Sequence, residues 1–171
     1  MNVKATVIAV LAAICLVLPA VARAQQMVIF VRHAERADGG APAGNMSGAP
    51  ADPLLSAAGQ ARAEKLAAML ADSGVKAIYA TEFHRTQDTG KPLAARLGLK
   101  VDTIAASDTA ALAAKIKTEH ARDVVLVIGH SNTLPAAIKA MGGPAVAMRD
   151  DEYDAIFVLN PATGGFTVFR Y

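Results

Sequence analysis

Short apolar strands alternate with amphipathic helical stretches along most of this chain, and that alternation constrains the fold more than any other feature. Strands are predicted at 27–31, 76–80, 99–103, 124–128, 155–159 and 166–171, and helices at about 56–72, 86–97, 108–120 and 134–141. The run at 124–128 is aliphatic throughout, which is typical of a strand buried on both faces. Strands alternating with helices predict a three-layer α/β/α fold around a mainly parallel central sheet.

Local signals mark where the predicted helices begin and end. Ser56 carries a hydroxyl that can cap a first helical turn, and Leu66 and Leu70 follow it at helical spacing. Gly98 closes the second predicted helix. The segment Asp38–Pro53 is dense in Gly, Pro and Ala and lacks apolar periodicity. We interpret it as a long loop that borders a site and helps to select the substrate.

The first 24 residues have the composition of a secretory signal peptide. Lys4 precedes an uninterrupted apolar run, Ala5–Leu18, and the small-residue pattern Ala22–Ala24 follows it. A positive start, an apolar segment and an A-x-A end predict cleavage after residue 24. The mature protein is then a single domain at 25–171 in the periplasm or secreted. A retained membrane anchor is the alternative interpretation.

Charge and cysteine content exclude several classes of function for the mature chain. The sequence has 17 basic and 15 acidic residues, but Lys4 and Arg23 lie in the predicted signal, so the mature chain is formally neutral. We therefore expect no nucleic-acid partner and no stable membrane insertion after the signal is removed. The only cysteine, Cys15, is also in the signal, so the mature chain has no thiolate for catalysis or metal binding.

Polar side chains follow three predicted strands at the point where each strand ends. They are Arg32 and His33, then Glu82 and Arg85, then His130. Ligands of parallel sheets bind beyond the carboxyl ends of the strands, so these side chains can converge at one edge. Arginine binds two phosphate oxygens at once, and a neutral imidazole is a competent nucleophile. The pattern predicts a phosphoryl-transfer site that needs no cofactor and no metal.

Four segments carry a resemblance to a known family. They are V-R-H-A-E at 31–35, D-P-L-L-S-A-A-G at 52–59, Y-A-T-E-F-H-R-T-Q-D-T at 79–89 and V-I-G-H-S-N at 127–132. In type and order they resemble the motifs of the histidine phosphatase (phosphoglycerate mutase-like) superfamily, branch 1, and in particular its small phosphohistidine-phosphatase-like members. Ala34 stands where glycine is usual in that family. The resemblance implies a phosphoglycerate mutase-like α/β fold.

The resemblance also assigns roles to four residues. It implies that His33 is the nucleophile and is transiently phosphorylated. It implies that Arg32, Arg85 and His130 hold the phosphoryl group, with His130 protonated.

In the family an Asp or Glu protonates the leaving oxygen, and the sequence leaves its identity open. Asp108 lies where some members place this acid, but an aspartate at that position also serves simply as a helix cap. Glu35 and Glu82 are alternatives, and Glu35 can instead bind substrate or orient an arginine. Asn132 is a further candidate for substrate binding, although capping the next helix explains it equally well.

These observations predict an exported, metal-independent phosphatase that hydrolyses a phosphomonoester through a phosphohistidine on His33. A small phosphorylated substrate such as an envelope phosphosugar fits the expected compartment. A non-catalytic phosphate- or phosphoglycan-binding module, a phosphohistidine phosphatase and a mutase remain alternatives that use the same pocket. A metal site built from His33, Glu35 and His130 is disfavoured, because the neighbouring arginines would repel a cation.

Overall fold

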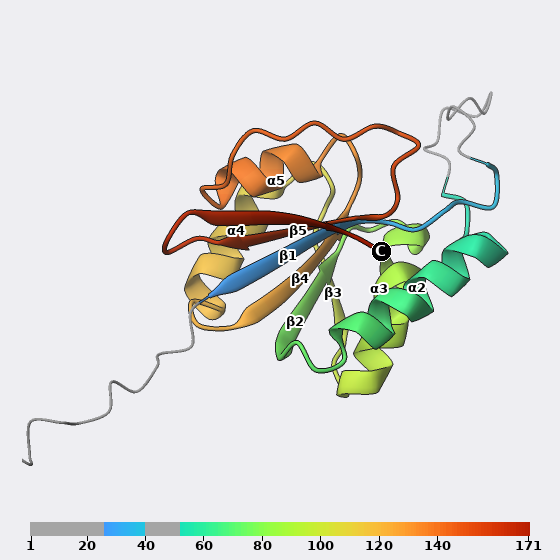
Figure 1. The fold of residues 1–171 in the computed structure, drawn as a ribbon, viewed down its shortest axis with the longest axis horizontal. Coiled ribbons are helices and arrows are strands. Elements are labelled where there is room, and N and C mark those ends of the chain that lie inside the picture. Colours follow the sequence, from blue (N-terminus) through green and yellow to red (C-terminus); the bar gives the residue numbers. More distant parts are fainter. Residues whose placement is uncertain (1–25, 40–51) are drawn as a thin grey trace, which may run out of the picture.

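The computed structural model describes residues 26–39 and 52–171 (Figure 1). The predicted signal peptide at 1–24 lies outside the described residues, and so does 40–51, which is most of the predicted loop Asp38–Pro53. Of the helices in the described part, none is long and apolar enough to cross a membrane.

A single twisted sheet runs through the described residues in the order β3-β2-β4-β1-β5-β6. Its strands are β1 (Met27–Arg32), β2 (Val75–Ala80), β3 (Val101–Thr103), β4 (Val124–Gly129), β5 (Ala155–Asn160) and β6 (Gly165–Arg170). The first four are mutually parallel, whereas β5 and β6 are antiparallel to their neighbours. The predicted, mainly parallel α/β sheet is therefore confirmed.

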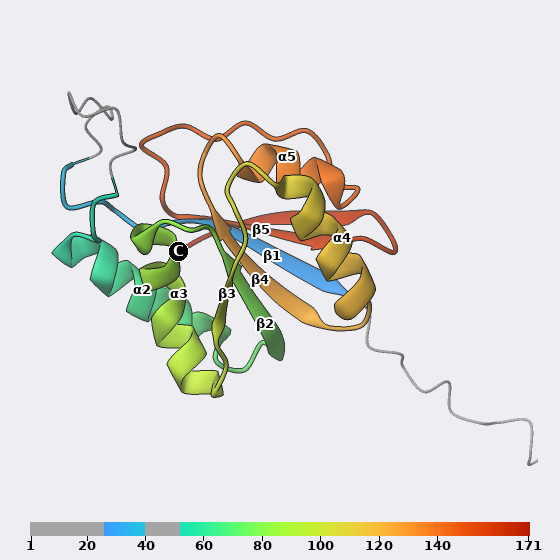
Figure 2. The same ribbon diagram turned by 180° about the vertical axis from the view of Figure 1, so that it is seen from behind.

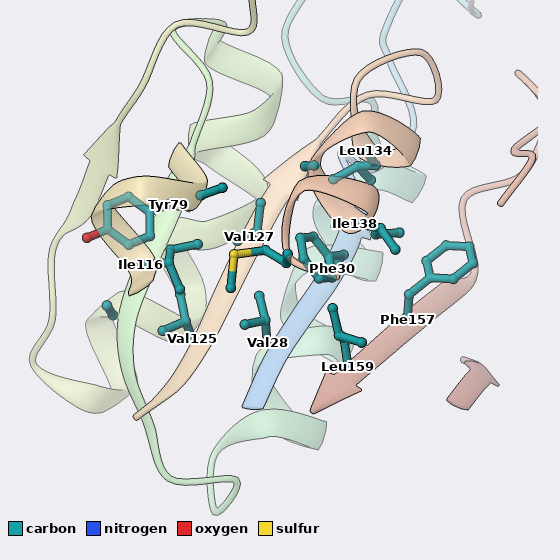
Figure 3. Close-up of a cluster of buried hydrophobic side chains, with 14 of the residues drawn as sticks. Val28, Phe30, Tyr79, Ile116, Val125, Val127, Leu134, Ile138, Phe157 and Leu159 are labelled. Atoms are coloured by element: carbon teal, nitrogen blue, oxygen red, sulfur yellow. The ribbon is translucent and has the colours of Figure 1, made fainter. Parts of the chain in front are cut away.

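Helices cover both faces of this sheet and complete the three layers (Figures 1 and 2). On one face lie α2 (Ala57–Leu70) and α3 (His84–Leu97), and on the other α4 (Thr109–Glu119) and α5 (Leu134–Ala140). Each face has its own cluster of buried apolar side chains. Figure 3 shows the cluster under α4 and α5, where Phe30 of β1 and Val127 of β4 meet Ile116 and Ile138.

The local signals in the sequence act as expected in most elements. The Ser56 hydroxyl accepts a hydrogen bond from the Gly59 amide and caps α2. Gly98 ends α3 in the left-handed conformation, with φ of 65°, which a residue without a β-carbon adopts readily. The second helix begins at His84, two residues before the predicted start. Arg85 therefore lies in the first turn of α3 rather than in a loop.

The sheet order brings the candidate site residues to one edge. Strand β4 lies between β2 and β1, and Arg32 of β1 is in register with Gly129 of β4. Ala80, the last residue of β2, is in register with Ile128. Because these strands are parallel and end together, the residues that follow them meet at the same rim of the sheet.

Candidate active site

Four predicted site residues gather at this rim, all of them buried. Arg32, His33, Arg85 and His130 are each less than one-tenth exposed. The rings of His33 and His130 lie edge to face, with centroids 5.2 Å apart. Charged and polar side chains are buried this deeply only when they are paired or functional, so the cluster is the natural candidate for an active site.

His33 is held by main-chain contacts on both sides. Its amide donates to the Gly129 carbonyl at 2.9 Å, which extends the pairing of β1 with β4. Its Nδ1 lies 2.8 Å from the Ala34 carbonyl oxygen. A carbonyl can only accept, so Nδ1 carries the proton and Nε2 of the neutral ring has the lone pair. Burial lowers the pKa of His33 to about 3, with further lowering by His130 and Arg32, so the ring is neutral at physiological pH.

Arg32 lies at the rim, and its guanidinium binds the segment before β5. Its Nη1 donates to the carbonyl oxygens of Arg149, Asp150 and Glu152, the shortest at 2.6 Å. The Tyr153 ring lies over the guanidinium, 4.1 Å from its carbon. Within the described residues, Nε of Arg32 is buried and makes no hydrogen bond.

Arg85 approaches the cluster from α3. Its guanidinium carbon lies 4.3 Å from the centre of the Phe83 ring, and its Nη1 lies 3.4 Å from Asp52 Oδ1. Burial and the nearby Arg36 lower the pKa of Arg85, while Asp52 opposes that shift. Arginine stays charged throughout the physiological range, so two fixed cations, Arg32 and Arg85, face this rim.

His130 is bonded on one side to Thr81, whose hydroxyl lies 2.9 Å from Nε2. Burial, followed by the charge of Arg85, lowers the pKa of His130 to about 4. The protein groups alone thus favour a neutral ring, whereas the family resemblance implies a protonated one. A phosphoryl dianion among these cations would raise the pKa, so protonation of His130 depends on a bound anion.

The loop that carries His33 rests on α2 and α3. The Ala34 amide donates to Thr89 Oγ1 at 2.9 Å. The Ser56 amide donates to the Glu35 carbonyl oxygen at 2.9 Å, and a β-carbon placed on Gly59 would lie 2.3 Å from that oxygen. Only glycine allows α2 to approach this loop so closely, which explains why the segment at 52–59 ends in Gly59.

The three carboxylates considered as proton donors are all engaged elsewhere. Asp108 is exposed and accepts from the Ala111 amide as the cap of α4. Glu35 forms a bidentate pair with Arg62, with Nε–Oε1 at 2.8 Å. Glu82 is exposed and accepts from an amide of the loop before α4. Within the described residues, no hydrogen bond or ion pair joins any of these carboxylates to the four clustered residues.

Burial raises the pKa of Glu35 in part, but the hydrogen bonds from Arg62 outweigh that effect and leave the pKa below its ordinary value. Glu35 is therefore an ionised partner of Arg62. Asn132 is exposed at the turn before α5. Within the described residues it makes no hydrogen bond to Arg32, His33, Arg85 or His130.

Sequence reasoning missed Thr81, Thr89 and Tyr153. The two threonines are buried and lie inside the segment at 79–89, whose resemblance to the family points to Arg85 alone. Thr89 lies four positions after Arg85, on the buried face of the same helix. A polar residue on a buried helix face indicates a hydrogen-bond partner and could have been noticed in the sequence. Tyr153 follows the acidic run at 150–152, and no pattern in the sequence links it to Arg32.

The residues described at 26–39 and 52–171 contain no group of three or more His, Cys, Asp or Glu side chains arranged to hold a metal ion.

Part of the sequence matches a known family. Residues 28–108 match the model of the histidine phosphatase superfamily, branch 1. That range includes His33, Arg85 and Asp108, while His130 lies beyond it. Among curated proteins, no sequence relative matches.

Solved structures of phosphatases have the same fold. The protein histidine phosphatase SixA, complexed with tungstate, is 19% identical with a TM-score of 0.60, and the match covers 84% of this chain and 94% of that one. A mycobacterial glucosyl-3-phosphoglycerate phosphatase with inorganic phosphate is 16% identical with a TM-score of 0.62, covering 85% and 96%. Phosphoserine phosphatase from Entamoeba histolytica is 14% identical with a TM-score of 0.60, covering 84% and 95%. At these identities the likeness establishes the fold alone.

Proposed function

We propose, from the premise that the chain belongs to the histidine phosphatase superfamily, that it hydrolyses phosphomonoesters through a phosphohistidine formed on His33. The family match and the phosphatases among the similar structures support a phosphatase. Our proposal adds the phosphohistidine intermediate, the independence from metal and the export of the protein.

The observation that carries the proposal is the hydrogen bond between His33 Nδ1 and the Ala34 carbonyl oxygen, at 2.8 Å. It fixes the proton on Nδ1 and leaves the Nε2 lone pair as the nucleophile. Burial keeps the ring neutral, and the lone pair is therefore available at physiological pH. A fixed, unprotonated imidazole nitrogen, with Arg32 and Arg85 near enough to lower the pKa of His33, suits attack on an anionic phosphorus centre.

The chemistry divides into two displacements at phosphorus. Nε2 of His33 attacks, the bond from phosphorus to the leaving oxygen breaks, and the leaving oxygen keeps the electron pair and takes up a proton from solvent water. Water then attacks the phosphohistidine, the P–N bond breaks with its electrons returning to Nε2, and inorganic phosphate leaves. Each step is easier than direct attack of water on the ester.

The arginines supply the charge stabilisation that this chemistry needs. Phosphoryl transfer depends mostly on positioning and on cations around the transferred group. Arg32 and Arg85 remain charged, and the buried Nε of Arg32 has no hydrogen bond within the described residues. A phosphoryl oxygen would satisfy this donor, whose desolvation otherwise costs about 1–3 kcal/mol. Fixed guanidinium groups can thus take the place of a metal ion, which supports a metal-independent reaction.

A second candidate function, removal of phosphate from phosphohistidine, is favoured by the positions of the carboxylates. Asp108 caps a helix, Glu35 is paired with Arg62, and Glu82 accepts from the amide of Ala106. A site without a committed carboxylic acid works best on leaving groups that need little protonation, such as an imidazole nitrogen or an aryl oxygen. The expected export of the chain favours a small envelope phosphoester instead, so both substrate types belong in the first assay.

The test is turnover of p-nitrophenyl phosphate and of phosphohistidine by the purified protein in EDTA, with His33→Asn as the matched variant. Asparagine can keep a hydrogen bond to the Ala34 carbonyl oxygen but has no nucleophilic nitrogen. We expect turnover in the wild type only, and acid-labile, base-stable phosphate on the wild-type protein after a rapid quench. Full activity in His33→Asn would refute the nucleophile.

The same purified protein can distinguish an enzyme from a non-catalytic phosphate-binding module. Arg85→Ala is expected to weaken inhibition by vanadate, because one of the two fixed cations is lost. Phosphate binding without turnover of either substrate would favour the binding module.

Export rests on the sequence of residues 1–24 and has its own test. Expression of the full chain in a bacterium, followed by fractionation and N-terminal sequencing, is expected to give a periplasmic or secreted protein that begins at Gln25. An uncleaved, membrane-bound product would indicate an anchor instead.

A further inference from the structure

A chain of buried hydroxyl groups supports His130 from behind. The Thr81 hydroxyl lies 2.9 Å from His130 Nε2 and 2.8 Å from the Thr86 hydroxyl. The Thr86 hydroxyl lies in turn 2.7 Å from the Phe83 carbonyl oxygen. Thr81 is 7% exposed and Thr86 is fully buried, so these contacts are made away from bulk water.

Counting protons along this chain gives every bond a direction. The Thr86 hydroxyl lies 2.7 Å from the Phe83 carbonyl oxygen and 3.1 Å from the Thr81 carbonyl oxygen, and because both carbonyls can only accept, the single proton of Thr86 is assigned to a carbonyl. The Thr86 oxygen then accepts from Thr81. Having donated to Thr86, Thr81 can only accept from His130, which requires a proton on Nε2 of His130. In the reverse direction Thr86 would donate to Thr81 Oγ1, and neither of its two hydroxyl–carbonyl contacts would hold a proton, although the Phe83 carbonyl also accepts from the Thr86 and Gln87 amides.

We propose that Thr81 is a positioning residue that holds His130 as the Nε2–H tautomer, so that Nδ1 is the nitrogen of His130 presented to the phosphoryl group. The inference rests on the proposed phosphatase function. Within the described residues Nδ1 of His130 makes no hydrogen bond, in contrast to Nε2.

The tautomer decides how His130 meets an anion. In the neutral Nε2–H form, Nδ1 has a lone pair, which a fully ionised phosphoryl oxygen would repel. A single proton between Nδ1 and that oxygen turns the contact into a charge-assisted hydrogen bond. Binding of the phosphoryl group is therefore coupled to a proton at Nδ1, carried in by the monoanionic substrate or taken from water.

The groups that face His130 are consistent with this coupling. Burial lowers the pKa of His130 most, Arg85, Arg32 and Arg36 lower it further, and Glu82 raises it. His33 lies edge to face with it at 5.2 Å. The surrounding cations oppose a positive His130 in the protein alone, and a bound dianion reverses that balance.

The ring orientation is also fixed, because a flipped ring would lose the Thr81 bond. The Phe83 ring stands edge to face with His130, with centroids 5.3 Å apart at an interplanar angle of 88°. The His130 amide donates to the Thr133 hydroxyl at 3.1 Å. Thr133 and Phe83 thereby hold the backbone and the ring, and Thr81 selects which nitrogen is left without a hydrogen bond to the described residues.

The first experiment reads the tautomer directly in the wild-type protein. Long-range ¹H–¹⁵N correlation spectra at pH 7 distinguish Nδ1–H from Nε2–H histidine, and the signals of His130 are identified by their loss in His130→Gln. We expect the Nε2–H pattern for His130. An Nδ1–H pattern would overturn the proposal, and this readout does not depend on catalytic activity.

The second experiment compares Thr81→Val with Thr81→Ser. Valine has the shape of threonine without the hydroxyl, whereas serine keeps the hydroxyl. Loss of a partner that orients a metal-binding histidine typically costs about 10- to 100-fold in activity, and we expect the same scale for the partner of His130. We expect a fall of this size in kcat of Thr81→Val, with KM changed less, together with loss of the pure Nε2–H pattern. Thr81→Ser should restore both to near wild-type values.

Outcomes for the two proposals are distinct. A wild-type protein without turnover counts against the proposed function. An active wild type together with an equally active Thr81→Val that keeps the Nε2–H pattern counts against Thr81 as the positioning residue. If Thr81→Val does not fold, the wild-type spectrum and the Thr81→Ser kinetics decide.

Discussion

The main-chain amide of Ala34 donates a hydrogen bond to the buried hydroxyl of Thr89, at 2.9 Å, and the same hydroxyl donates to the Arg85 carbonyl oxygen at 2.7 Å. Ala34 follows His33, the proposed nucleophile, and Arg85 lies on the same helix as Thr89. One side chain thus connects the loop of His33 to the helix that carries Arg85, which we propose binds phosphate.

Thr89→Val is expected to lower both stability and kcat. The Ala34 amide would lose its partner in a buried position, which costs about 1–3 kcal/mol. Thr89→Ser keeps the hydroxyl and serves as the matched control. Thermal unfolding and p-nitrophenyl phosphate kinetics measure the two effects, and equal values for both variants would show that the hydroxyl is dispensable.

Gly59→Ala is expected to destabilise the protein although alanine favours helices. The helical preference of alanine over glycine is about 1 kcal/mol. The new β-carbon would lie 2.3 Å from the Glu35 carbonyl oxygen, a main-chain atom that cannot move without shifting the nucleophile's loop. Overpacking of this kind costs about 1–3 kcal/mol, so the clash prevails.

The control for that variant is Gly165→Ala, where the nearest atom to the new β-carbon is the Thr163 hydroxyl oxygen at 3.2 Å. Chemical denaturation of both variants compares the same substitution with and without a main-chain obstacle. If Gly59→Ala is as stable as Gly165→Ala, the close approach of α2 to the loop is not required.

Acid should destabilise the fold through its buried histidines. The pKa values of His33 and His130 fall from 6.5 to about 3 and about 4 on folding. Between these values and 6.5 the unfolded chain binds more protons, so stability is full above pH 6.5 and is lost as the pH falls below it. From pH 7 to pH 5, each histidine is expected to contribute a loss of about 2 kcal/mol.

The measurement is thermal unfolding across this range in phosphate-free buffer, compared with the double variant His33→Asn/His130→Asn. The double variant should lose less stability on acidification than the wild type. An identical decline in the two proteins would assign the acid sensitivity to other groups.

Tyr153→Ala is expected to weaken binding of phosphate, because the Arg32 guanidinium loses the ring that covers it at 4.1 Å. A partly buried cation–π contact contributes about 1 kcal/mol, which corresponds to a change of about fivefold in the dissociation constant. Tyr153→Phe keeps the ring and loses only a hydroxyl contact at 3.4 Å. Calorimetric titration with phosphate should place Tyr153→Phe near the wild type, and a similar loss in both variants would contradict a role for the ring.

Features that depend on near neighbours in the chain were predictable from the sequence. Six strands and the helices between them follow from apolar periodicity, and Ser56, Gly98 and Asp108 act as caps because capping involves only residues a few positions away. The convergence of Arg32, His33 and His130 was also predictable, since residues after neighbouring parallel strands share one rim.

Tertiary structure alone decided which atoms of those residues are free for chemistry. Glu35 pairs with Arg62 across 27 positions, Ala34 with Thr89 across 55 positions, and Arg32 binds a carbonyl 118 positions away. Periodicity and motifs identify residue types and local geometry, but a hydrogen bond between distant segments depends on how the layers pack. The sequence by itself determined the fold and the residues at the rim. Packing determined their tautomers, their charges and their partners, because burial and distant neighbours set these properties.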